Sequence, residues 1–304
     1  MAERKSWWKI GLLSVIVVPV AMLLLSWGLA RIEASSMDLQ EHLLIRDLPQ
    51  PSVAVLESGQ NVSGNAIASA PGKVIIDVTG VELRVKASPA GGPIRILALY
   101  DKDTEELIES FETDTADGWE YRVSLHRVED SFMGHMTAVF ATGYPEFTVL
   151  LPKDTPMALE LKLAQGGGAV DLGGLSLTSA TVNLLQGGMG LTVSEPMPQP
   201  MERFSFAGSM AGAGLSKIGN ASPAIIDVTH KMGGMDLDLR GEWKQDSEIG
   251  FAVDMGGAGL QLPDNTAIKG LEERGIAYVA STDSATPTLT IATKASNGEI
   301  EIRP

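Results

Sequence analysis

The stretch VNLLQGG at residues 182–188, closed by Leu191, decides the fold, because it is one of five related copies between residues 159 and 262. Each copy alternates apolar residues, then carries Gln or Met, two small residues that are usually Gly-Gly, and a closing apolar residue. The copies begin at Leu161, Val182, Phe206, Val228 and Phe251, and they close at Val170, Leu191, Leu215, Leu237 and Leu260. Successive closing residues are therefore 21, 24, 22 and 23 positions apart.

This repeat predicts a β-solenoid. Alternating apolar positions turn one face of a strand inward. A glycine pair allows a tight bend with positive φ, or very close approach of two backbones, so we interpret the glycines as bends and not as ligand cradles. About 22 residues cover two or three short strands with turns, which is one coil, and stacked coils share a core that no single coil can bury. Gln or Met before the glycines would form a ladder along the stack.

Further strands are expected before the repeats. Short apolar runs with strand character occur at residues 74–78, 81–85, 94–100, 121–128, 136–140 and 147–151. The acidic segment 101–118 between two of them is predicted to be a hairpin with a long tip. Residues 73–304 thus form an all-β domain, either a β-solenoid or a two-sheet stacked repeat.

The N-terminus predicts a transmembrane anchor. Residues 10–30 carry no charge, and a helix of that length spans about 31 Å, close to the ~30 Å hydrocarbon core. Basic residues precede the segment and acidic ones soon follow it, so the positive-inside rule places the N-terminus in the cytoplasm and the rest outside. A cleavable signal peptide is the alternative, but its apolar region is usually shorter. The flanking residues are Arg4, Lys5, Trp7, Trp8 and Lys9 before the span, and Arg31, Glu33 and Asp38 after it.

Three parts of the chain follow from this. Residues 1–30 are the anchor. Residues 31–48 have helical spacing of apolar residues before Pro49 and Pro51, and residues 49–72 are rich in Pro, Ser, Gly, Asn and Ala. We therefore expect a juxtamembrane helix and a linker over 31–72, followed by the extracytoplasmic domain at 73–304.

Composition excludes several functions. The chain has no cysteine, which removes disulfides, thiolate catalysis and cysteine-bound metal. Its formal net charge is −15; the first 30 residues carry +2, so residues 31–304 carry −17. Such a surface repels phosphate backbones, and nucleic-acid binding is not expected.

No motif for catalysis or metal binding stands out. The four histidines, His42, His126, His135 and His230, are scattered without metal-ligand spacing, and His230 occupies an alternating position where a packed side chain is expected. Residues 101–112 place carboxylates as a calcium loop does, but the sixth position is Glu106 instead of the required Gly, which favours a solvated hairpin. We predict no catalytic, cofactor-binding or metal-binding residues, no cofactor and no small-molecule substrate.

The repeats resemble the toast-rack β-solenoid domains of bacterial envelope proteins, which include the C-terminal domain of LiaF-type antibiotic-response proteins and a set of adhesin-like domains. The likeness rests on the runs of the VNLLQGG kind and on the lead-in LPKDTP at residues 151–156. It implies a bacterial inner-membrane protein with a periplasmic domain and an interaction or stress-sensing role. The chain departs from LiaF-type proteins in having one predicted span where they usually have several.

The sequence therefore predicts a non-enzymatic, single-pass scaffold that contacts lipid through residues 10–30 and binds protein partners at the membrane. One alternative is an accessory structural subunit of a larger respiratory or photosynthetic complex. Another is a β-helix enzyme acting on acidic polysaccharides, because its clustered Asp, Lys and Arg would be assembled across coils and could not be read from a linear sequence.

Overall fold

The computed structural model describes residues 39–48, 72–88, 92–102, 104–115, 118–128, 145–264, 266–272 and 286–304. The expected anchor at 10–30, the expected strand at 136–140 and His135 lie outside these ranges. Within them, none of the helical segments has the length and apolar character needed to traverse a bilayer. The described residues form strands and one short 3-10 helix, η1 (Ile218–Ala221), so the all-β prediction is confirmed.

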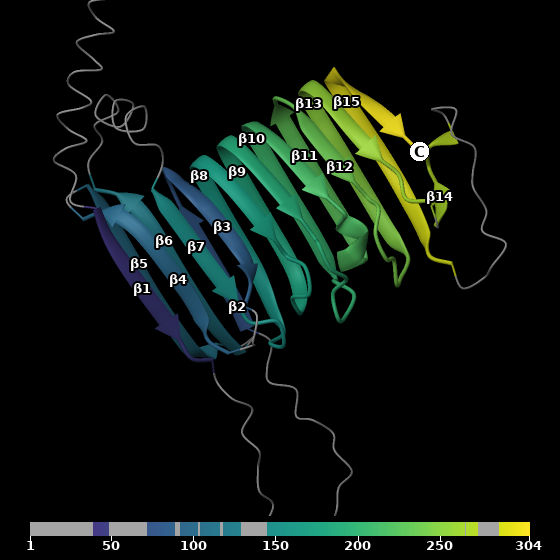
Figure 1. The fold of residues 1–304 in the computed structure, drawn as a ribbon. Coiled ribbons are helices and arrows are strands. Elements are labelled where there is room, and N and C mark those ends of the chain that lie inside the picture. The colour runs from purple at the N-terminus through teal and green to yellow at the C-terminus, as the bar shows by residue number, and fades with distance from the viewer. Residues whose placement is uncertain are drawn as a thin grey trace, which may run out of the picture.

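The repeats stack as parallel strands in register, side by side along one row (Figure 1). Val182 lies beside Leu161, and Phe206, Val228 and Phe251 follow in the same register, so every predicted copy aligns with its neighbours. The strands are β8 (Met157–Asp171), β9 (Leu177–Thr192), β10 (Arg203–Ser216), β11 (Ile225–Met232) with β12 (Met235–Asp238), β13 (Ser247–Gln261) and β15 (Thr288–Arg303).

Most coils are built from one long strand, and this corrects the expectation of two or three short strands per repeat. The glycines bend the strand without ending it: Gly166, Gly187 and Gly256 have φ of 127°, 125° and 131° in the middle of β8, β9 and β13. Both arms of β8 pair with β9 on one side, but on the other side they pair with two different strands. The first arm of β8 pairs with β2 (Gly72–Val78), and its second arm pairs with β3 (Val81–Ala87).

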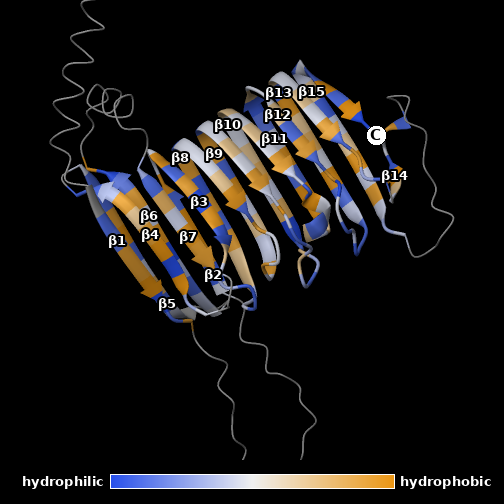
Figure 2. Ribbon diagram, viewed as in Figure 1, coloured by the Kyte–Doolittle hydropathy of each residue, from blue (hydrophilic) through white to orange (hydrophobic). Residues whose placement is uncertain are grey.

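The core lies inside the stacked coils as one continuous cluster. Along the first arms of β8 and β9, buried apolar residues alternate with partly exposed ones, and Figure 2 shows orange segments interspersed with white and blue ones. The connections between strands close the remaining side of the core with apolar residues, because a two-armed strand alone leaves that side open. Buried residues of these connections include Leu172, Leu175, Val193, Met197, Ile218, Leu239, Trp243 and Leu262.

The N-terminal strands complete and cap the stack out of chain order. β2 and β3 form one coil, and β6 (Gly118–Arg127) and β7 (Glu146–Leu151) form the next one outward, in parallel register. β4 (Ile94–Asp101) then pairs antiparallel with β7, β1 (Leu39–Arg46) with β4, and β5 (Glu105–Thr115) with β6. At the other end, β14 (Ala267–Lys269) pairs with the start of β15.

Two expectations for this region are wrong. The predicted juxtamembrane helix at 31–48 is a strand over Leu39–Arg46, because eight residues pair with β4 and the side chains from Glu41 onward alternate in exposure with period two. The predicted hairpin tip at 101–118 is the eleven-residue strand β5. Its acidic side chains lie on an edge strand, where charge discourages pairing with other chains.

Candidate interaction surface

A ladder of exposed side chains runs along the corner of the stack. The residue before each glycine pair stands beside its counterpart in the next coil, as predicted, and the C-terminal coil adds Asn297. At one end, Gln165 Nε2 donates a hydrogen bond to Gln186 Oε1 at 3.2 Å. The next three rungs, which we call the methionine ladder, are Met210, Met232 and Met255, exposed by 54%, 44% and 40%.

The corner glycines hold this ladder outside the core. A Cβ atom at Gly187 would overlap the carbonyl oxygen of Gly166, and one at Gly256 would overlap that of Gly233, so each corner sits directly on its neighbour. Positive φ and this close approach both require glycine. The preceding side chain then has no room inward and points to solvent. In β10 the corner position is Ala211, which has no positive φ, in keeping with the degenerate sequence of that copy.

Beside the ladder, the second arms present a flat face with little side-chain cover, which we call the glycine face. Cβ atoms built at Gly188, Gly212, Gly234 and Gly257 would meet nothing within 4 Å, and the same holds at Gly190 and Gly214. The backbone of four neighbouring coils is therefore directly accessible. Thioether side chains adapt to varied partners, and an apolar row beside a flat sheet offers a docking strip.

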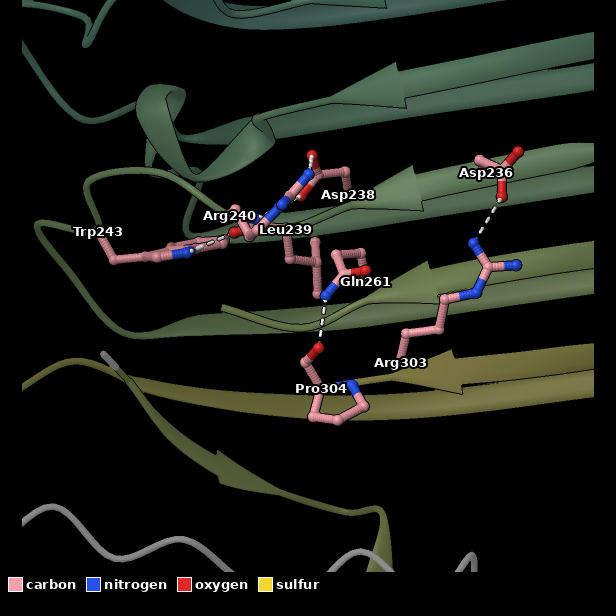
Figure 3. Close-up of polar contacts among 8 residues, drawn as sticks. All are labelled: Asp236, Asp238, Leu239, Arg240, Trp243, Gln261, Arg303 and Pro304. Carbon is pink, nitrogen blue, oxygen red and sulfur yellow. Dashed lines mark hydrogen bonds and ion pairs between the residues drawn. The ribbon is translucent and has the colours of Figure 1, made fainter. Parts of the chain in front are cut away.

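Polar contacts tie the C-terminal coils together (Figure 3). Arg303 of β15 approaches Asp236 of β12 to 4.0 Å across the intervening Gly259 of β13. A Cβ at Gly259 would overlap the Asp236 carboxylate, so this glycine leaves space for the contact. Gln261 Nε2 donates to the Pro304 carbonyl at 2.7 Å, and Trp243 Nε1 donates to the Leu239 carbonyl at 2.8 Å. Arg240 binds Asp238 through both carboxylate oxygens and holds the pKa of Asp238 below its ordinary value.

A polar cluster closes the N-terminal end of the core. Arg46 of β1 reaches Glu109 of β5 at 2.8 Å, and its guanidinium lies 5.3 Å from the centre of the Phe111 ring. Arg46 therefore connects the two arms at the end of the core, where the described part of the chain adds no further coil. The Tyr121 ring is fully buried behind this contact, and burial raises the pKa of its hydroxyl. The sequence placed Glu109 only in the calcium-loop pattern at 101–112 and did not pair it with Arg46, because the two residues are 63 positions apart.

The histidines described by the structure lie apart from one another. His42 and His126 are half-buried on β1 and β6, and His230 is 2% exposed inside the core, as predicted. Burial lowers the pKa of His230, and neither ring nitrogen has a hydrogen-bond partner among the described residues. The imidazole fills the space left by Gly208 in the adjacent coil, where a Cβ would overlap Nδ1. Across the described ranges, no three His, Asp or Glu residues are grouped as metal ligands.

The comparisons with known proteins give a distant likeness among solved structures. No family model matches the chain, and no curated protein matches it. Among solved structures, the chain is similar to a putative cell adhesion protein from Clostridium sporogenes, with a TM-score of 0.44 and 13% identity over 87% of this chain and 99% of that chain. A likeness at that level carries no assignment of family or function.

Proposed function

We propose that the chain is a non-catalytic scaffold that is held at the membrane by residues 10–30 and binds a protein partner on the outer side through its methionine ladder. The observation that carries this proposal is the ladder itself: three exposed methionines in register, one on each of three neighbouring coils. Thioethers in a row bury apolar area against a partner, and the adjoining glycine face allows that partner close to the backbone.

The sequence patterns supply the rest of the proposal. The charge bias around residues 10–30 supports an inner-membrane anchor with the domain outside the cytoplasm. The repeat runs support a place among toast-rack domains of the bacterial envelope. A stress-sensing or adhesin-like scaffold and an accessory subunit of a respiratory or photosynthetic complex would both use such a surface, and they differ in whether the partner stays bound.

The test is purification of the full chain from its native membrane in mild detergent, with and without the triple substitution M210S/M232S/M255S. We expect a protein partner to co-purify with the unaltered chain and to be lost from the triple variant. V128S is the matched control, because Val128 is 60% exposed but lies at the N-terminal end of the stack. A partner retained by the triple variant would contradict the role of the ladder. Cleavage of an acidic glycan by the purified chain would contradict the non-catalytic function.

A further inference from the structure

An apolar and basic patch lies on the outer face of the N-terminal strands. Leu43 and Ile45 of β1 are 54% and 55% exposed, and Leu97 of β4 is 39% exposed. The registers place Leu43 beside Leu97, and Ile45 beside Arg95. Isolated exposed apolar residues are common on protein surfaces, but three on two paired strands form a contiguous patch.

The same face continues into basic residues. One row across the strands reads Ile45, Arg95, Leu150 and Lys86, with the two cations alternating between apolar side chains. Arg95 and Lys86 are exposed, and no carboxylate pairs with either among the described residues. Leu43, Ile45, Leu97, Arg95 and Lys86 together are called the N-terminal patch below.

Acidic residues surround this patch: on its own strands, Glu82 of β3 and Glu146 of β7 lie on the same outer face, and Glu146 is paired with Arg84. In the second arms, the outer face carries Asp236, Glu299 and Glu301 at the opposite end of the stack, with the glycine face between. Glu41 and Asp47 border the patch at the two ends of β1. The domain as a whole is acidic, so the two unpaired cations stand out locally, where long-range repulsion from anionic surfaces would be offset by short-range contacts.

The chain connection limits what the patch can reach. Only residues 31–38 separate the uncharged segment 10–30 from β1. Eight residues span at most about 28 Å, so an anchored chain holds Leu39, where β1 begins, within that distance of the bilayer surface. A face that combines apolar side chains with Lys and Arg is the composition that binds the headgroup region of a membrane.

We propose that the N-terminal patch docks on the lipid surface, with Leu43, Ile45 and Leu97 entering the headgroup region and Arg95 and Lys86 contacting anionic lipid. This inference rests on the proposed membrane anchoring, and it adds a second contact that fixes the orientation of the domain. The acidic end of the face is then turned away from the bilayer, and the methionine ladder is held at a defined height for a partner.

The test uses the full chain in vesicles of phosphatidylcholine with phosphatidylglycerol, containing lipid with a nitroxide on the headgroup. Because the chain has no cysteine, L97C accepts a single fluorescent NBD label, and T229C on β11 is the matched control at an exposed position far along the stack. We expect at least about twofold stronger nitroxide quenching at residue 97 than at residue 229. Quenching at residue 97 equal to that at residue 229 would overturn the proposal.

Two further variants identify the contact. L43E/I45E should reduce quenching at residue 97 to the control level, and R95E/K86E should reduce it in vesicles with phosphatidylglycerol more than in pure phosphatidylcholine. Far-UV circular dichroism shows whether each variant is folded. If labelled L97C is not quenched and unlabelled L97C forms a disulfide between two chains, the patch is assigned to a second copy and lipid is rejected. Alkaline carbonate separates the two hypotheses: release of the chain rejects the anchor, and retention without quenching rejects only the patch.

Discussion

The two halves of the stack build the same coil in different ways. From β8 to β15 most coils are single strands bent at a glycine corner, and neighbours in space are neighbours in sequence. From β1 to β7 each coil is made of separate strands; β2 and β3 are joined at Thr79-Gly80, where Gly80 has φ of 73°, and Val81 takes the position of the corner glycine of β8. A coil therefore forms wherever strands pair in register over a shared core. The glycine repeat is one sequence that produces such a coil, and the N-terminal half produces it without the repeat.

The largest expected effect tests whether the halves share one core. Phe206 and Phe147 lie in different halves, are 2% and 0% exposed, and belong to one apolar cluster. F206A and F147A should each lower the free energy of unfolding by about 3–5 kcal/mol. Denaturant unfolding followed by tryptophan fluorescence and circular dichroism should still give one coincident transition in each variant. Two separate transitions would show that the halves are independent units.

The next effect tests the bent corner of the C-terminal half. G187A places a Cβ against the Gly166 carbonyl at φ of 125°, and should cost about 2–4 kcal/mol from strain and overlap. The adjacent G188A is the control: its Cβ enters open space, so the change should stay within about 0.5 kcal/mol. Chemical denaturation measures both free energies of unfolding. Equal losses in G187A and G188A would contradict the requirement for glycine at the corner position.

A smaller effect depends on pH and comes from His230. Burial lowers the pKa of His230 in the folded state below the ordinary value of 6.5, so as pH falls below about 6.5 the unfolded chain takes up the proton first. Stability should therefore decrease from pH 7 toward pH 5, and H230L should lose this part of the decrease. Melting temperatures at the two pH values check it. An unchanged pH dependence in H230L would show that the imidazole is already protonated or solvated in the fold.

Glu105 in the N-terminal half should act in the opposite direction. Burial raises the pKa of Glu105 above its ordinary 4.5, so its stabilising contribution is complete below 4.5 and is lost as pH rises through the folded value. Compared with the unaltered chain at the same pH, E105Q should therefore gain more stability at pH 7 than at pH 4. If E105Q lowers stability equally at both pH values, titration of Glu105 does not contribute to the pH dependence; glutamine keeps an acceptor oxygen for the Asp101 amide.

The smallest expected effect is on a surface ion pair. R240A removes both side-chain hydrogen bonds to Asp238, but the arginine is 56% exposed, and such exposed pairs contribute little to stability and weaken with salt. R46A should cost more, because Glu109 is 21% exposed and would lose its partner at the open end of the core. Urea unfolding at low and high salt compares the two. A larger loss in R240A would show that the N-terminal cluster is not a closure of the core.

For the C-terminal half, the sequence predicted the individual coils and their register. For the N-terminal half, it predicted β structure but not the order of the strands. Alternation and glycine pairs are local signals, so the register of five coils followed from residues 159–262. The coil formed by β15 was missed because Thr293, Ala295 and Asn297 replace larger apolar residues and Met at the end of the core. The cap formed by β1 and β5 depends on pairing between distant segments, for which a single sequence carries no signal. The spacing of the apolar residues in β1 fits a helix as well as a strand, and only the pairing with β4 decides for the strand.

The surfaces also differ in whether the sequence predicts them. The ladder was predicted because it repeats with the coil. The glycine face depends on which glycines lie on the outer side of the coils. The N-terminal patch depends on the strand order β1-β4-β7-β3. A local sequence pattern predicts neither of them.

The most direct test of the account is the distance between spin labels at positions 162 and 294, introduced as cysteines in this cysteine-free chain. Both positions lie in one register row, five strands apart: Lys162, Asn183, Ala207, Thr229, Ala252 and Lys294. Strands 4.7–4.9 Å apart place the two Cα atoms about 24 Å apart, and double electron–electron resonance should give a narrow distribution near that value. A broad distribution, or one centred beyond about 40 Å, would contradict parallel coils stacked in register.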